Sequence, residues 1–211
     1  ETTRHCMSLF DVPLHFTFHQ ISHSNGQFDM RHLLDGSLVA AFPNQAVTFV
    51  ENHDSQKGQA LESTVAEWFK PLAYGLILLR QEGLPCIFYG DYYGVKGDFA
   101  QAAFQEVLDQ LCYIRKHHVY GEQVDYFDHG NCIGWTCLGN NEHPAGVAVV
   151  LSNSEAGWKE MSMGSLNSGK VFIDYLGNCS EEVVIGQDGW ASFPVQGGSL
   201  SAWIDKESLL F

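Results

Sequence analysis

The sequence predicts an α/β segment followed by an all-β domain. Three observations point to this order. Strand-like apolar runs alternate with helical patterns up to about residue 117, short strand-like runs separated by turn residues fill the chain after Gly121, and the pattern changes at 117–121. Alternating strands and helices are typical of parallel sheets, and evenly spaced short strands are typical of antiparallel sandwiches or barrels. We therefore place one domain at 1–119, a second at 120–206 and a tail at 207–211.

The first half contains three predicted strands, "SLFDV" (8–12), "AVTFV" (46–50) and "CIFYG" (86–90). "AVTFV" is continuously apolar or β-branched, as expected for a strand that is buried on both faces of a parallel sheet. Helical patterns lie between and after these strands: one from Pro13, one over "MRHLLDGSLVAAF" (30–42), one over 61–79 that Pro71 should kink, and one over 99–117.

The second half contains short runs that alternate with turn residues such as "LGNNEHPAG", "NSEAG", "QDG" and "QGG". Such spacing predicts an antiparallel sandwich or barrel of about 80–90 residues. The predicted strands are "QVDYF", "CIGWTC", "GVAVVLS", "KEMSM", "KVFIDY", "EEVVI", "WASFPV" and "SLSAWI".

The composition argues against several classes of protein. The 211 residues are 45% hydrophobic and 13% aromatic, which is enough to form a core, and the net charge of −14 with 11 basic residues argues against a nucleic-acid partner. No stretch approaches the roughly 18 apolar residues of a membrane helix, and no secretory signal is visible after Glu1. Among six cysteines, Cys132 and Cys137 could pair across a hairpin, but free thiols in a reducing compartment are favoured, which predicts a cytoplasmic protein.

The tryptophans, and the two tyrosines that follow the third strand, have possible structural roles as well as functional ones. We expect Trp68 and the adjacent Phe69 to pack in the core, and we expect the three tryptophans of the second half to fill the sandwich. Tyr92 and Tyr93 fit a sugar-stacking role and loop packing equally well. The tryptophans of the second half are Trp135, Trp190 and Trp203.

The α/β half is incomplete as a sheet. Three parallel strands leave two unpaired edges, and such edges are normally covered or closed. We therefore expect the α/β half to be a segment of a larger sheet whose other strands lie outside this sequence.

A cluster of polar residues follows the second strand. Asn52, His53 and Asp54 come directly after "AVTFV" and Glu51. In barrels of parallel strands, functional groups gather where the strands end. The alternative is that Asp54 caps the following turn and that His53 is an ordinary loop histidine.

The stretch "FVENHDSQKGQALESTVAEWFKPLAYGLILLRQEGLPCIFYGDYYG" resembles the α-amylases of glycoside hydrolase family 13, in particular the liquefying and intracellular bacterial types. The resemblance extends through "FDVPLHFTFH", "FDMRHLLDG", "YFDHGNCIGW" and "QGGSLS", and it covers essentially the whole chain. It implies that the three strands are strands six to eight of a TIM (β/α)8 barrel, and that the β-rich remainder is the family's C-terminal Greek-key β-sandwich domain.

The resemblance also implies roles for the polar cluster. Asp54 would be the third catalytic acid, which stabilises the sugar in an oxocarbenium-like transition state, and His53 and Asn52 would bind substrate. The reaction would be retaining hydrolysis of internal α-1,4-glucosidic bonds of starch or glycogen. Glu51 departs from the family pattern, which usually has Asp there.

The family's nucleophile and acid/base carboxylates lie on strands four and five, and neither of their sequence blocks occurs here. Asp11 and Asp91 follow the first and third strands, where they could line the same mouth or serve the structure. Neither they nor Asp29 falls in a nucleophile or acid motif. We therefore expect this chain to be inactive alone and to need the N-terminal half of the same amylase as its partner.

Calcium is the family's metal, and the resemblance implies one site within this chain. Its ligands would be carbonyls of Gly26, Phe28 and Gly130 together with the side chains of Asn131 and Asn153. The family has carboxylates at the last two positions, and calcium prefers anionic oxygens among its ligands. The site is therefore expected to be weak or empty here, and the family's main calcium cluster would lie outside this chain.

Two alternative functions of the chain remain open. The chain could be a non-catalytic fragment that binds α-glucan or only packs, or it could belong to another activity of the same family. Its compartment is also open, since a secretion signal would lie on the absent half.

Overall fold

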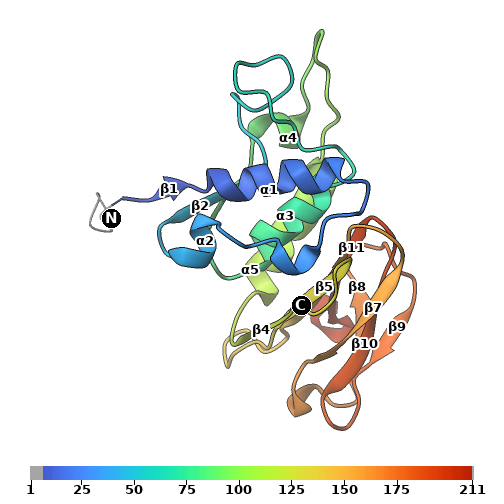
Figure 1. Ribbon diagram of the computed structural model, residues 1–211. Helices are drawn as coiled ribbons and strands as arrows, with labels where there is room; N and C mark the ends of the chain where they lie inside the picture. The colour runs from blue at the N-terminus through green and yellow to red at the C-terminus, as the bar shows by residue number, and fades with distance from the viewer. Residues whose placement is uncertain (1–6, 211) are drawn as a thin grey trace.

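The computed structural model describes residues 7–210, without the side chain of Leu210. Cys6, among the predicted free cysteines, lies outside the described residues, as does Phe211 of the predicted tail. The chain forms an α/β part and a β domain that lie side by side (Figure 1). The elements are, in order, β1 Leu9–Phe10, α1 Val12–His23, η1 Met30–His32, α2 Leu38–Ala41, β2 Ala46–Phe49, α3 Lys70–Leu79, β3 Leu84–Cys86, α4 Tyr89–Tyr93, α5 Gln105–His118, β4 Gln123–Tyr126, β5 Cys132–Cys137, β6 Val147–Ser152, β7 Gly157–Ser162, η2 Ser165–Asn167, β8 Val171–Asp174, β9 Glu182–Val184, β10 Trp190–Val195, β11 Ser199–Asp205 and η3 Lys206–Leu210.

The α/β part contains a three-stranded parallel sheet in the order β1-β2-β3. Helices α1 and α2 lie between β1 and β2 in the chain, α3 lies between β2 and β3, and α4 and α5 follow β3. Among the described residues, each outer strand pairs only with β2, so the sheet has two open edges, as predicted. Side chains near the β1 edge are exposed although they are apolar: Leu9 47%, Phe10 55%, Val12 45% and Phe16 53%. The β1 edge of the sheet therefore carries exposed apolar side chains.

The predicted helix over 61–79 is wrong in its first half. Helix α3 begins only at Lys70, with Pro71 in its first turn, so the proline starts the helix and does not kink it. Proline is well tolerated there because it has no N–H to donate and its φ is already helical. The apolar spacing before it comes from a loop whose Val65 backbone N–H donates to the Glu51 carboxylate at 2.8 Å.

The predicted helix over 30–42 is also interrupted. A short 3-10 turn (Met30–His32) and the four-residue helix α2 are separated by a turn in which Gly36 has φ +71°. That conformation is readily available to glycine and breaks the helical hydrogen-bond ladder. Helix α5 begins at Gln105, six residues later than predicted.

The β domain contains a six-stranded antiparallel sheet in the order β4-β5-β6-β11-β8-β9 and a two-stranded sheet of β7 and β10. All eight predicted runs form strands. The last strand lies between β6 and β8, so the chain returns to the centre of the sheet, which is the kind of connection found in Greek-key sandwiches. The predicted tail continues as the 3-10 helix η3 to Leu210.

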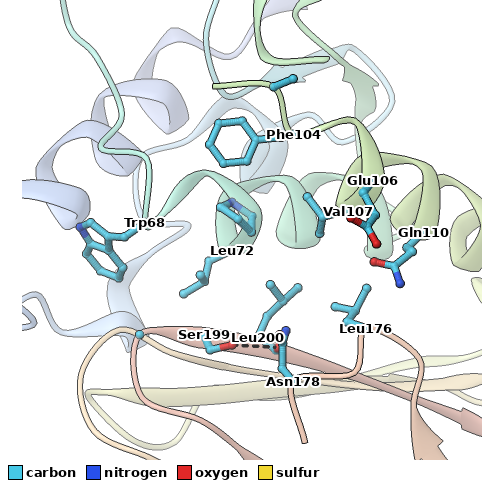
Figure 2. Close-up of a pocket in the computed structure, with 13 residues that line it drawn as sticks. Trp68, Leu72, Phe104, Glu106, Val107, Gln110, Leu176, Asn178, Ser199 and Leu200 are labelled. Carbon is cyan, nitrogen blue, oxygen red and sulfur yellow. Dashed lines mark hydrogen bonds between the residues drawn. The ribbon is translucent and has the colours of Figure 1, made fainter. Parts of the chain in front are cut away.

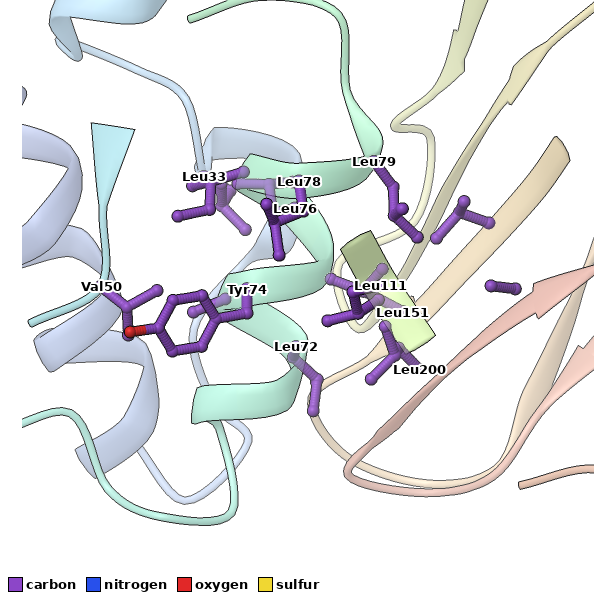
Figure 3. Close-up of a cluster of buried hydrophobic side chains, with 14 of the residues drawn as sticks. Leu33, Val50, Leu72, Tyr74, Leu76, Leu78, Leu79, Leu111, Leu151 and Leu200 are labelled. Atoms are coloured by element: carbon purple, nitrogen blue, oxygen red, sulfur yellow. The ribbon is translucent and has the colours of Figure 1, made fainter. Parts of the chain in front are cut away.

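The central strands of the large sheet are buried on both faces. Alternate residues of β6 enter two different cores: Val149 and Leu151 pack with the helices, whereas Ala148 and Val150 pack inside the sandwich. Successive side chains of a strand point to opposite faces, so a continuous apolar run is needed where both faces are covered. Figure 3 shows the first core, in which Leu151 and Leu200 of the β domain lie near leucines of α3 and α5. The two parts of the chain therefore share one core.

Among the four tryptophan predictions, the one for Trp203 is confirmed. Trp203 is completely buried inside the sandwich, whereas Trp135 is completely buried on the other face of the sheet, against the helices. Trp190 is 46% exposed and Trp68 38% exposed, although Phe69 beside it is buried. The indole nitrogen of Trp68 donates to the Ser22 carbonyl at 3.0 Å, which holds the ring at the surface.

The five described cysteines are free thiols, as predicted. Cys132 and Cys137 lie on the same strand, β5, so the alternative of a bond across a hairpin is excluded. Burial raises the pKa of Cys132 to about 11 and that of Cys137 to about 12, which keeps both thiols protonated and unreactive. Within residues 7–210 every helix is too short or too polar to cross a membrane.

Candidate active site

The polar cluster lies in the turn that follows β2. The side chain of Asn52 shapes this turn, because its Oδ1 accepts hydrogen bonds from the backbone N–H groups of Asp54 (2.9 Å) and Ser55 (3.0 Å). The Ser55 hydroxyl in turn accepts from the Asn52 backbone N–H at 3.0 Å. Asparagine is favoured in such turns because its short side chain mimics a backbone carbonyl. The oxygen of Asn52 is thus engaged within the turn.

His53 and Asp54 project outward from this turn. Their side chains are 81% and 53% exposed, and His53 Nε2 lies 3.5 Å from Asp54 Oδ2. Asp54 and Asn52 line a hollow of about 530 Å³ together with aromatic and aliphatic side chains of β1, α1 and β2. The apolar residues of this hollow include Phe10, Phe16, Phe49 and Leu61. Two ionisable groups therefore lie beside an open apolar surface at the end of a parallel strand.

A buried group of polar and charged side chains begins at Glu51, directly before the turn. We call it the Lys70 network, and its members are Glu51, Lys70, Tyr74 and Asp91. Lys70 Nζ lies 2.8 Å from Glu51 Oε2 and 2.5 Å from Asp91 Oδ1, and the Tyr74 hydroxyl donates to Asp91 Oδ2 at 2.6 Å. The lysine side chain is 2% exposed, and both carboxylates are fully buried. The network joins the end of β2, the first turn of α3 and helix α4.

The Lys70 network holds two carboxylates against one ammonium. Burial raises the pKa of Glu51, and attraction to Lys70 opposes that rise. Burial and the neighbouring Asp91 carboxylate raise the pKa of Tyr74 well above its usual range. Glu51 also accepts from the Val65 backbone N–H, so this carboxylate anchors the loop between β2 and α3. These groups fix the turn and lie too deep to contact a solute.

His15 is a second group that the sequence pattern did not single out. It lines the hollow, stacks on Phe49 with ring centroids 5.1 Å apart, and is fixed at both nitrogens by Val50 O (2.7 Å) and Ser63 Oγ (2.8 Å). Burial lowers its pKa, so the ring is neutral at neutral pH. Its partners lie 35 and 48 residues away, and no local spacing in the sequence indicates that contact.

The other candidate carboxylates have structural roles. Asp11 is completely buried and accepts from Leu14 N (3.1 Å) in α1 and from Leu38 N (2.9 Å) and Val39 N (2.7 Å) in α2. Asp91 belongs to the Lys70 network. Asp29 lies in the loop after α1, where its bond to Arg31 lowers the pKa of Asp29 to about 2. None of the three carboxylates lines the hollow beside Asp54.

The tyrosines after β3 contact one another. Tyr89 and Tyr93 are 72% and 58% exposed with ring centroids 4.6 Å apart, and the Tyr92 hydroxyl donates to Asp109 at 2.6 Å. Tyr89 and Tyr93 are free to contact a ligand, whereas Tyr92 is tied to α5.

A second hollow, of about 470 Å³, lies where the helices meet the β domain (Figure 2). Trp68, Leu72 and Phe104 lie on its helical side. Asn178, Ser199 and Leu200 lie on its strand side. It contains an exposed indole and polar side chains, but it lies apart from Asp54.

The five residues of the expected calcium site come together at the junction of the two parts. Gly26 and Phe28 lie in the loop after α1, Gly130 and Asn131 precede β5, and Asn153 follows β6. Asn131 Nδ2 donates to Gly26 O at 2.8 Å, and Asn153 Nδ2 donates to Phe28 O at 2.9 Å. Within the described residues, no group of three or more His, Cys, Asp or Glu side chains is arranged to hold a metal ion.

Comparison with known proteins identifies relatives along nearly the whole chain. A family model described as "Alpha-amylase C-terminal" matches residues 147–204. The chain is 48% identical over 207 residues to the α-amylase of Geobacillus stearothermophilus, and that match covers 98% of this chain and 38% of the relative. It is 48% identical over 200 residues to the glucan 1,4-α-maltohexaosidase of Bacillus sp. strain 707, covering 94% and 38%. The cytoplasmic α-amylase of Escherichia coli K12 is 44% identical over 208 residues, covering 94% and 42%.

Solved structures with the same fold are more distant in sequence. The α-amylase I of Eisenia fetida superimposes with a TM-score of 0.66 at 15% identity, covering 92% of this chain and 48% of that one. The γ-CGTase of an alkalophilic Bacillus clarkii gives 0.60 at 18%, covering 90% and 30%. At this identity the comparison supports the fold alone. The chain spans about two fifths of the length of the curated relatives it matches.

Proposed function

The chain belongs to the α-amylase family of glycoside hydrolases, as the C-terminal part of such an enzyme, and from this premise we propose that the complete protein hydrolyses internal α-1,4-glucosidic bonds of starch or glycogen with retention. In this proposal the chain supplies Asp54 and His53 to the active site. The observation that carries the proposal is the position of Asp54, exposed at the end of a parallel strand and beside an open hollow.

The three-stranded sheet supports the idea that the chain is a segment of a closed barrel. We propose that β1, β2 and β3 are strands six, seven and eight of a (β/α)8 barrel, and that the remaining strands come from the N-terminal part of the same amylase. Both open edges and the exposed Leu9, Phe10 and Phe16 fit a surface that further strands would cover. In such barrels the reacting groups lie at the ends of the strands, where Asp54 is found.

Asp54 would act on the charge that develops during the reaction. A retaining glycosidase passes through an oxocarbenium-like transition state, whose positive charge a nearby carboxylate stabilises. His53, 3.5 Å from this carboxylate, would hydrogen-bond the hydroxyls of the same sugar and strengthen those bonds in the transition state. Asn52 would contribute indirectly, since its oxygen already holds the turn that presents both side chains.

The nucleophile and the acid/base would come from the partner part. Retaining enzymes need two carboxyl groups about 5 Å apart. Asp11 and Asp91 are buried and bonded to backbone or to Lys70, so neither can reach a substrate. The 211-residue chain is therefore expected to be inactive by itself.

The proposal is tested with Asp54→Asn in the complete protein. Loss of one preorganised group that stabilises charge in the transition state typically lowers kcat by about 100- to 1000-fold. We expect such a loss for starch hydrolysis, with the KM for soluble starch changed far less. Asp35→Asn is the matched control, because the Asp35 carboxylate is 72% exposed and pairs with His32 away from the hollow. Near-normal kcat in the Asp54→Asn protein would remove the catalytic role.

A binding role without catalysis is the second candidate. The exposed Trp68, which lines the same hollow as Asn178 and Ser199, favours it, because an indole in a hollow that also has polar groups suits a sugar ring (Figure 2). Titration of the isolated chain with maltooligosaccharides distinguishes the two roles. Binding that Asp54→Ala leaves unchanged and Trp68→Ala abolishes supports a separate glucan site.

For the compartment we propose the cytoplasm. The curated relative from Escherichia coli is named a cytoplasmic α-amylase, and the five described cysteines are free. Fractionation of the source cells tests this assignment.

A further inference from the structure

Two asparagine side chains join the α/β part to the β domain at the junction of the loop after α1 with strands β5 and β6. Asn131 Nδ2 donates both to Gly26 O (2.8 Å) and to Asn153 Oδ1 (3.1 Å), and Asn153 Nδ2 donates to Phe28 O (2.9 Å). The Asn153 backbone N–H donates to Asn131 O at 3.1 Å, which fixes the two residues relative to each other. We call Asn131 and Asn153 the amide pair.

The junction encloses the two members of the amide pair to different degrees, since Asn131 is half-buried. Asn153 is 3% exposed. Gly26 has φ +75°, and a Cβ at that position would lie 3.1 Å from Asn153 O, so the loop approaches the β domain through a residue without a side chain. The oxygen of Gly130 accepts from Met30 N at 2.6 Å. The loop carbonyls are therefore held at fixed positions.

These residues do not fit a calcium ion. Calcium takes six to eight oxygen ligands, usually with carboxylates among them. Here the carbonyls of Gly26 and Phe28 already accept N–H groups, and the amide pair brings no negative charge. The nearby carboxylate of Asp29 is engaged by Arg31. The amide orientation also follows from its partners, because a flipped amide would set its oxygen against a carbonyl oxygen.

We propose that the amide pair takes the place of a cation and makes this junction independent of calcium. An N–H group and a divalent cation both satisfy carbonyl oxygens that converge on one place. An Asn supplies that donor from its own side chain, whereas an Asp at the same position would add a negative charge and would need a cation to bind the two carbonyls. The identity of residues 131 and 153 thus selects between a hydrogen-bonded junction and a metal-bound one. This inference does not rest on the proposed hydrolase activity.

The test is the calcium content of the complete protein, measured by elemental analysis after equilibration with calcium and removal of the excess. Three proteins are compared: the unaltered protein, Asn131→Asp/Asn153→Asp, and Asn131→Ser/Asn153→Ser. We expect the Asp variant to hold one calcium ion more per chain than the unaltered protein, and the Ser variant to hold the same number. Comparison between proteins cancels any calcium bound elsewhere.

Thermal unfolding provides a second readout. We expect added calcium to raise the Tm of the Asp variant by more than it raises the Tm of the unaltered protein. If the Asp variant folds only in the presence of calcium, the proposal is also supported. One calcium fewer in the Ser variant would show that the amide oxygens ligate a metal and would overturn the proposal. A folded Asp variant without an additional calcium ion would overturn it too, because the carbonyls would then form no cation site.

Discussion

Lys70→Met removes the only cation of the Lys70 network while keeping the length of the side chain. It leaves Glu51 and Asp91 fully buried without the ammonium that lies 2.8 and 2.5 Å from them. Removal of one partner from a buried ion pair costs about 3–5 kcal/mol, because an uncompensated charge remains. Two carboxylates lose their partner here, so we expect a loss at the upper end of that range near neutral pH.

The pH dependence gives the prediction a sharper form. Burial already raises the pKa of Glu51, and loss of Lys70 removes the attraction that opposes this rise. A carboxyl group whose folded pKa is raised favours the folded state at low pH and opposes it as the pH rises through its unfolded and then its folded pKa. The Lys70→Met protein should therefore lose less stability at acidic pH than at neutral pH, relative to the unaltered protein.

The assay is thermal unfolding of the complete protein from pH 5 to 8, with Lys57→Met as the control because Lys57 is exposed. The double variant Glu51→Gln/Lys70→Met should recover part of the lost Tm, since one of the two stranded charges is then absent. If Lys70→Met lowers the Tm no more than Lys57→Met, or by the same amount at every pH, the network does not hold its charges in the way described.

Other parts of the structure give further expectations. Burial lowers the pKa of His118 to about 4. The stability that the neutral ring contributes is therefore present above about pH 6.5 and is lost as the pH falls toward 4. The loss amounts to about 3 kcal/mol, at about 1.4 kcal/mol per pKa unit. His118→Leu should flatten the decline in Tm between pH 6.5 and 4, and an unchanged slope would exclude His118 as its source. Asp11→Ala removes the acceptor of N–H groups in α1 and α2, at roughly 1 kcal/mol for each helix, whereas Asp98→Ala at an exposed position should have little effect in the same urea titration. Leu200→Ala should cost about 2–5 kcal/mol, because this side chain joins the helices to the β domain; a loss below 1 kcal/mol would contradict the shared core.

Local sequence patterns predicted the strands better than the helices. The strand-like runs of the second half and "AVTFV" of the first became strands, because period-two or continuous apolar patterning needs no information about distant residues. The strand predicted over "CIFYG" (86–90) is wrong beyond Cys86, since β3 is Leu84–Cys86 and helix α4 begins at Tyr89. The helix predicted over 61–79 failed in its first part for the opposite reason. Val65 and Ser63 bond to Glu51 and His15, and these tertiary contacts hold the segment out of the helix.

Some residues of the candidate site could be predicted from the local sequence, and others could not. The position of Asp54 after a parallel strand follows from the local pattern and from the family resemblance. The Lys70 network does not follow from the local pattern, because Lys70 lies 19 residues from Glu51 and 21 from Asp91 in the chain. Likewise Asp11 could not be separated from a mouth-lining role until its bonds to α1 and α2 were visible.

The sequence by itself therefore determined the order of strands and helices, the change from parallel to antiparallel structure near residue 120, and the place of the polar cluster at the end of β2. Only the tertiary structure decided which carboxylates are free to act, which tryptophans are buried, and whether asparagines at the junction donate to carbonyls. The physical reason is that hydrophobic periodicity is a property of neighbouring residues, whereas burial and hydrogen bonding of a polar group depend on partners brought together by the packing of the whole chain.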